Sequence, residues 1–110
     1  MNLDELASSV HKTAVDKGFW QGYHESNANA FICMKLALIH SEVTEVLEAI
    51  RKDKTEKEVM DEFADIIIRT LDLYAGMNER WFDENQSIQF AINQKRNVNS
   101  GRKKLHGNKF

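Results

Sequence analysis

The chain contains no proline, and only five of its 110 residues are glycine. Proline breaks helices because it lacks an amide hydrogen and its ring clashes with the preceding turn, while glycine weakens them through its backbone freedom. Long segments with apolar residues every three or four positions therefore run uninterrupted, and no alternating pattern typical of strands competes with them. The sequence predicts an all-α fold.

Four helices are expected from the apolar periodicity and the capping residues. The first ends at Gly18, a residue suited to the position after a helix. The third begins at Thr55, which has capping-box spacing with Glu58, and continues to about residue 76 or 79. The expected helices cover about residues 3–17, 28–51, 55–79 and 83–97, and the last dozen residues are expected to form an irregular tail.

The length is that of one domain with a modest core, so residues 1–110 are interpreted as a single domain. The single cysteine, Cys33, excludes an internal disulfide and a cysteine-based zinc cage. The first ten residues lack the pattern of a signal peptide, and no apolar run approaches the roughly 20 residues that cross a bilayer. A cytoplasmic protein without a membrane partner is expected.

The third predicted helix is apolar around most of its circumference. Such a helix must be buried on more than one side, which four helices of this length cannot easily provide. The fold expected is a helical bundle of about four helices whose core is completed by dimerisation, in a homodimer or homotetramer. The alternative is a single bundle with one overloaded core helix. The apolar residues are Val59, Met60, Phe63, Ala64, Ile66, Ile67, Ile68, Leu71, Leu73 and Tyr74.

Charge is divided unevenly along the chain. All 17 acidic residues lie at or before Glu84, and with nine basic residues they give residues 1–94 a net charge of −8. Residues 95–110 contain six basic residues and no acid, a net charge of +6. A non-enzymatic helical protein that binds nucleic acid through this tail, or acts as an adaptor, is an alternative function. The acidic body would repel a phosphate backbone and no recognition motif is present, so a nucleic-acid partner is not expected.

Two pairs of carboxylates, Glu42 with Glu45 and Glu62 with Asp65, stand three residues apart in apolar surroundings. Residues three apart share a helix face, where like charges repel by roughly a few tenths of a kcal/mol. A short turn joins the two helices, so they should be antiparallel neighbours with the pairs roughly level. Four converging carboxylates require a cation; the alternative is that each pair lies on an ordinary solvated face.

Ligand chemistry narrows the choice of metal. Carboxylate oxygens suit Mg²⁺, with Mn²⁺ as a substitute. A di-iron bundle would need Glu-x-x-His, and a zinc site of the common helical type would need His-x-x-x-His; neither pattern occurs. No chemistry is assigned to the histidines, which are His11, His24, His40 and His106.

Glu-x-x-Glu, sixteen residues, and then Glu-x-x-Asp resembles the signature of the MazG-like all-α nucleoside triphosphate pyrophosphohydrolases. The segments "KLALIHSEVTEVLEAIR", "DEFADIIIRTLDL" and "HGNKF" resemble this family as well, and the resemblance covers roughly residues 15–110. It implies that Glu42, Glu45, Glu62 and Asp65 hold Mg²⁺ and are catalytic. It also implies hydrolysis of a (deoxy)nucleoside triphosphate to the monophosphate and pyrophosphate, by a bundle that two chains build in dimers or tetramers.

The resemblance also suggests substrate contacts. It implies that Lys95, Asn99 and Arg102, after the last helix, contact the substrate. Because cations placed at the leaving pyrophosphate would raise turnover, residues 95–104 of the basic tail are expected to fold back over the metal site.

The resemblance favours Trp20 in the base pocket. The loop that holds Phe19, Trp20 and Tyr23, called the aromatic loop, could instead cap the end of the bundle.

Three further side chains near the acids have possible roles. Lys35 lies about two turns before Glu42, where it could reach a phosphate or be an ordinary solvated lysine. Arg69 follows Glu62 by seven residues and is expected to pair with Asp65 or Asp72. Glu45 is a candidate for accepting the proton of the attacking water.

Overall fold

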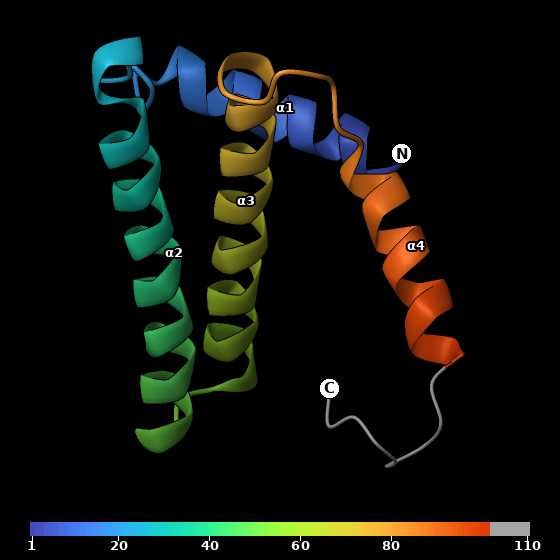
Figure 1. Cartoon of the computed structure of the whole chain (residues 1–110). Helices are drawn as coiled ribbons and strands as arrows, with labels where there is room; N and C mark the ends of the chain where they lie inside the picture. The colour runs from blue at the N-terminus through green and yellow to red at the C-terminus, as the bar shows by residue number, and fades with distance from the viewer. Residues whose placement is uncertain (102–110) are drawn as a thin grey trace.

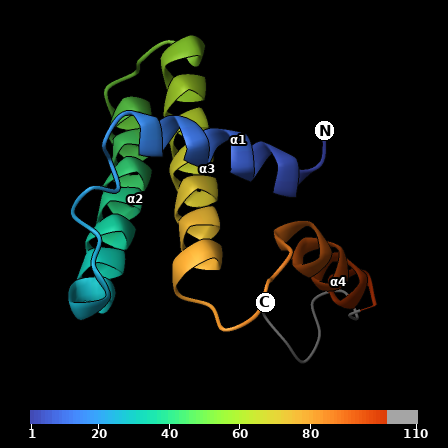
Figure 2. The ribbon, with the colours of Figure 1, turned by 90° about the horizontal axis from the view of Figure 1, so that it is seen from above.

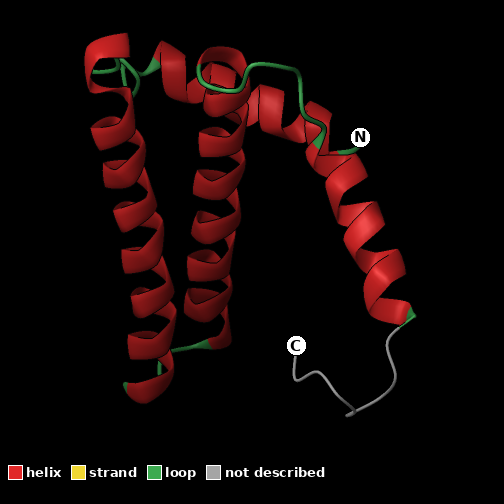
Figure 3. Ribbon diagram, viewed as in Figure 1, coloured by secondary structure: helices red, strands yellow, loops and turns green. Residues whose placement is uncertain are grey.

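The computed structural model describes residues 1–101, which form four α-helices and one short 3-10 helix (Figure 1). These are α1 (Leu3–Asp16), η1 (Glu25–Asn27), α2 (Ala28–Arg51), α3 (Glu56–Arg80) and α4 (Ile88–Ser100). Figure 3 shows that this part of the chain contains no strand. The all-α helical bundle expected from the sequence is confirmed. None of the helices in the described residues combines the length and hydropathy needed to cross a membrane.

The two long helices, α2 and α3, form an antiparallel hairpin, and α1 crosses the C-terminal half of α3 (Figures 1 and 2). The fourth helix packs against α1 and points away from the hairpin. In the turn between α2 and α3, Asp53 has a φ of 55°, a left-handed conformation that a short polar side chain tolerates. Thr55 then starts α3 by accepting a hydrogen bond from the Glu58 amide at 3.1 Å.

The last helix differs from the sequence prediction at both ends. It begins at Ile88 rather than near residue 83, because Ser87 caps it by accepting a hydrogen bond from the Phe90 amide at 3.0 Å. The preceding segment is held outside a helix by Asn78, whose side-chain oxygen accepts from the Gln86 amide at 2.7 Å. The helix then continues to Ser100, so the start of the expected irregular tail is helical.

The core lies where α1, the aromatic loop, α2 and the C-terminal half of α3 meet. Its buried residues are Ala7, Ala14, Trp20, Phe31, Ile32, Leu71, Leu73 and Ala75. One buried polar group joins three of these segments. The Asp72 carboxylate of α3 accepts from Trp20 Nε1 at 2.9 Å and lies 2.7 Å from His11 Nδ1, which therefore carries the proton. Both ring systems are nearly inaccessible, with His11 4% and Trp20 6% exposed.

One side of the hairpin carries exposed apolar side chains. At about 100° per residue, these side chains lie nearly opposite Glu62, Asp65 and Arg69 on α3, and well away from Glu45 on α2. Each is between 46% and 63% exposed, because α1 covers only the C-terminal half of α3. We call this surface the apolar face, and it consists of Leu36, Val43, Leu47, Ile50, Met60, Phe63 and Ile67.

Gly76 leads to a testable prediction about the core. A Cβ atom there would lie 2.1 Å from Cη2 of Trp20, whose buried indole is fixed by its hydrogen bond to Asp72. Gly76→Ala should therefore lower the free energy of unfolding by about 1–3 kcal/mol, as overpacking does. Urea denaturation followed by circular dichroism measures the loss.

The matched control is Gly101→Ala, where the nearest atoms to a new Cβ lie at 3.6 Å, an ordinary contact. This variant should stay within about 0.5 kcal/mol of the parent. Equal stabilities for the two variants would contradict the packing of Trp20 against α3.

Candidate functional site

Three carboxylates from the two hairpin helices meet at one point. Glu42 of α2 and Glu62 and Asp65 of α3 each offer one oxygen, and these oxygens lie within 4.8 Å of one another. Glu42 and Glu62 are half-buried and Asp65 is exposed. The antiparallel hairpin produces this arrangement, as the sequence analysis expected for the carboxylate pairs. We call these three residues the carboxylate triad.

Glu45, the fourth expected ligand, is exposed and lies outside the triad. The negative charge of Glu45 nevertheless acts on Glu62, whose pKa is raised above its ordinary value. Desolvation is the largest cause, followed by the negative charges of Asp65 and Glu42 and then by that of Glu45. The charged form of Glu62 is therefore disfavoured first by desolvation and then by the neighbouring carboxylates.

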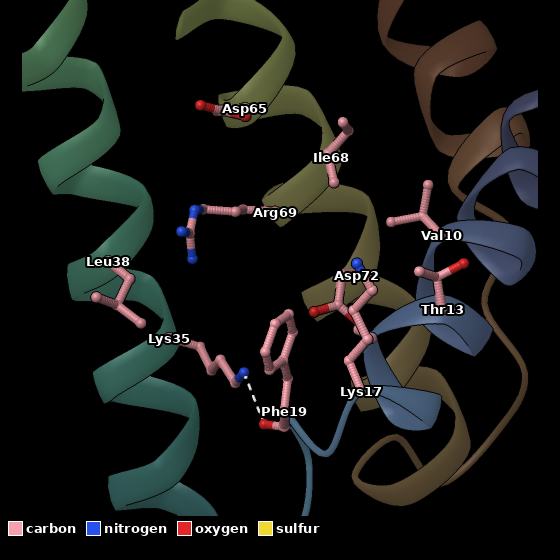
Figure 4. A pocket seen from close by; sticks show the side chains of 11 residues that line it. Val10, Thr13, Lys17, Phe19, Lys35, Leu38, Asp65, Ile68, Arg69 and Asp72 are labelled. Atoms are coloured by element: carbon pink, nitrogen blue, oxygen red, sulfur yellow. Dashed lines mark hydrogen bonds between the residues drawn. The ribbon is translucent and has the colours of Figure 1, made fainter.

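One cation reaches the triad from within the chain. Arg69 Nε lies 3.0 Å from Glu42 Oε1, joining α3 to α2. The sequence analysis expected Arg69 to pair with Asp65 or Asp72; the interhelical pair replaces this because the side chain extends towards α2 rather than along its own helix (Figure 4). The Arg69 side chain is 47% exposed and that of Glu42 is 16% exposed.

A cavity of about 440 Å³ adjoins the triad, between α1, the loop after it, α2 and α3 (Figure 4). Asp65 and Arg69 line it, so the cavity and the triad are continuous. Its wall combines cationic and apolar side chains with two carboxylates, Asp65 and Asp72. The cationic side chains are Lys17, Lys35 and Arg69, and the apolar ones are Val10, Ala14, Phe19, Leu38 and Ile68.

Lys35 is held against this wall. Its ammonium group donates to the Phe19 carbonyl at 3.0 Å and lies 5.2 Å from the ring centroids of both Trp20 and Phe31. Burial lowers the pKa of Lys35, Asp72 opposes that shift, and the positive charge of Arg69 adds to it. Lys35 is therefore a fixed part of the cavity rather than a freely solvated lysine.

Two adjacent residues of the aromatic loop differ in exposure, since one is buried in the core and the other lies at the surface. Trp20, which the sequence analysis favoured as a base-stacking group, is buried and hydrogen-bonded to Asp72. Its neighbour Phe19 is 58% exposed and lines the cavity. The sequence signal, two adjacent aromatic residues after Gly18, could not show which would face the interior.

The remaining expected contacts are not brought to the triad within one chain. Lys95 and Asn99 lie on α4, which points away from the hairpin (Figure 1). Helical residues 95–100 do not fold back over the carboxylates, and Arg102 lies outside the described residues. Lys17, conversely, was missed by the sequence analysis because only the crossing of α1 over α3 brings it to the cavity.

Comparisons with known proteins found no counterpart. No protein-family model matches the chain, and neither a search of curated proteins nor a search of solved structures found a match.

The raised pKa of Glu62 predicts that the triad destabilises the chain when no metal is present. Above that pKa, Glu62 is charged in both the folded and the unfolded chain, but the desolvation and the repulsion act only in the folded one. Glu62→Gln should therefore raise the midpoint of thermal unfolding at pH 7 in a chelating buffer. As the pH falls through the raised pKa, folded Glu62 takes up its proton first, so the difference should shrink.

Glu48→Gln is the control, because it removes a negative charge from α2 without removing one from the triad. Glu48 pairs only loosely with Arg51, at 3.9 Å. Its unfolding midpoint should hold or fall slightly at every pH. A Glu62→Gln midpoint no higher than that of the parent would contradict uncompensated repulsion.

Proposed function

We propose that this protein is a Mg²⁺-dependent nucleoside triphosphate pyrophosphohydrolase. The observation that carries the proposal is a carboxylate triad that is continuous with a cavity lined by three cationic side chains. Carboxylates suit a divalent ion and the cations suit a polyphosphate, so the two halves fit one metal–triphosphate substrate. The resemblance of the sequence to the MazG-like family supports the same reaction.

The donor set fits the proposed metal. All three ligands are hard carboxylate oxygens, which Mg²⁺ prefers and Mn²⁺ accepts. Their oxygens all lie within 4.8 Å of one another, so a single ion would be within reach of all three residues. Glu42, Glu62 and Asp65 would hold the ion, and Glu45 lies close enough to act electrostatically on the site. When bound, the ion would supply polarisation of the phosphate and neutralisation of charge on the leaving pyrophosphate.

The other side chains bind and orient the substrate. Arg69 and Lys35 direct positive charge into the cavity near the triad, where they would contact phosphate oxygens. The apolar part of the wall, with exposed Phe19, would accommodate the nucleoside. The cavity volume falls within the range of small-molecule sites. Glu45, exposed beside the triad, would accept the proton of the attacking water.

A homo-oligomer is part of the proposal, and the apolar face is the surface on which a second copy would pack. Seven half-exposed apolar side chains on two adjacent helices form a larger patch than scattered surface residues would. Since this face lies nearly opposite Glu62, Asp65 and Arg69 on α3, association there would leave the cavity open. Lys95 and Asn99 would then contact substrate only if they came from another copy, because α4 points away from its own triad.

The activity is tested by pyrophosphate release from a panel of ribo- and deoxyribonucleoside triphosphates with Mg²⁺. Glu42→Gln and Glu62→Gln should each lower turnover by about a hundredfold or more, since each removes a proposed metal ligand. Glu48→Gln should retain parental turnover. Near-parental activity in both triad variants would refute the site assignment.

The alternative function has a different signature. A chain that releases no pyrophosphate from any triphosphate with Mg²⁺ or Mn²⁺, yet binds DNA or RNA in low salt, would be a nucleic-acid binder. That result would replace the enzymatic proposal.

Self-association is tested by sedimentation. The parent should sediment as a dimer or larger at micromolar concentration, and Ile67→Glu should sediment as a monomer or aggregate, because it places a charge in the proposed interface. Val15→Glu is the control: Val15 is also partly exposed, but lies on α1 outside the apolar face. A stable monomeric parent would contradict the oligomer.

A further inference from the structure

Within residues 1–101, one cation is bonded to the triad, and it belongs to the chain itself. Arg69 Nε is 3.0 Å from Glu42 Oε1, the distance of a charge-assisted hydrogen bond. Among the residues that the structure describes, Glu42 is the only acid with an oxygen within 4.0 Å of this guanidinium. Glu42 is also one of the three residues whose oxygens converge. One carboxylate therefore faces two mutually competing cations, a guanidinium and a proposed metal ion.

Arg69 has room to leave Glu42. Its side chain is about half exposed and lines the cavity beside Lys35, so it can rotate without disturbing a packed group. Figure 4 shows the guanidinium in the gap between α2 and α3, with Asp65 on one side and Lys35 on the other. A phosphate group in the cavity would lie within reach of Arg69. The guanidinium is therefore bonded to Glu42 and would also be able to reach a phosphate bound in the cavity.

We propose that Arg69 is an exchangeable counter-ion, bonded to Glu42 without metal and transferred to a substrate phosphate when the metal takes Glu42. This inference rests on the proposed function. A metal ion that takes Glu42 from the guanidinium would leave Arg69 without this partner. Metal that arrives with a polyphosphate provides the new partner at the same moment. Metal and polyphosphate should therefore bind cooperatively, with Arg69 as the source of the coupling.

The competing explanation is a permanent tie between α2 and α3. In that case Arg69 would keep Glu42 in place whatever is bound, and its loss would weaken metal binding and stability together. An exchangeable counter-ion predicts effects of opposite sign: tighter binding of metal alone and weaker binding of metal with polyphosphate. The two accounts therefore differ in direction and not only in size.

The test compares the affinity of the full-length parent and of the Arg69→Gln variant for Mn²⁺. Electron paramagnetic resonance measures the free ion, and bound Mn²⁺ follows by difference. Mn²⁺ alone should bind about five- to tenfold more tightly to the variant, because a nearby positive charge has been removed. The preformed Mn²⁺–tripolyphosphate complex should bind about tenfold more weakly, because a charge-assisted contact is lost. Equal or weaker binding of Mn²⁺ alone would overturn the proposal in favour of the permanent tie.

Arg51→Gln is the matched control. Arg51 is exposed on α2, pairs with Glu48, and lies nine residues from Glu42, about 13 Å along the helix. Both binding constants should match those of the parent. Arg69→Lys, which keeps the charge but not the planar fork, should bind both probes with affinities between those of the parent and Arg69→Gln.

A spectroscopic measurement on the parent chain does not depend on the variant's stability. The Arg69 Nε–H resonance, identified by its absence from Arg69→Lys, should shift on adding Mg²⁺ and shift again on adding tripolyphosphate. If the chemical shift of this resonance stays unchanged after both additions while Mn²⁺ binds, the proposed exchange is wrong. If the parent binds no Mn²⁺, or Glu62→Gln binds it equally well, the proposed metal site fails first and the exchange fails with it.

Discussion

The register of α2 against α3 is the constraint on which the site depends. The turn with left-handed Asp53 and the Thr55 cap determine where α3 begins, and therefore which residues lie opposite Glu42. One residue more or less in this turn would rotate α3 by about 100° relative to α2 and separate Glu62 and Asp65 from Glu42. The Arg69–Glu42 pair joins the same two helices, so the triad and its internal cation both depend on how α2 packs against α3.

A second interaction builds the cavity beside the triad. Asp72 lies one turn beyond Arg69 and accepts from Trp20, while its contact with His11 fixes α1 across α3. The crossing of α1 then places Lys17 and Phe19 at the wall opposite α2. Asp65, Arg69 and Asp72 share one face of α3, which therefore passes from the site to the core within eight residues. The absence of a side chain at Gly76 lets the Trp20 ring approach α3 closely enough for this arrangement.

The hairpin has two unlike sides, and the difference separates the proposed chemistry from the proposed assembly. One side carries the triad, the cationic groups and the cavity; the other carries the apolar face. Helical periodicity separates these functions, since residues three or four apart share a side while residues two apart do not. A second copy on the apolar face would thus bury hydrophobic surface without desolvating the carboxylates.

The sequence by itself determined the all-α fold, and the three triad residues are among the four carboxylates that it singled out. Apolar spacing without proline left no other regular structure, and α2 was predicted with its observed bounds because its period is unbroken. The carboxylate spacing, with a short turn between, was enough to expect convergence, since local helix geometry dictates which residues share a face. Tertiary structure alone decided the rest: Arg69 pairs with Glu42, Trp20 is buried while Phe19 is exposed, and α4 points away from the triad. These outcomes depend on how separate helices cross, and a crossing angle is set by side-chain packing between segments far apart in the chain rather than by local spacing.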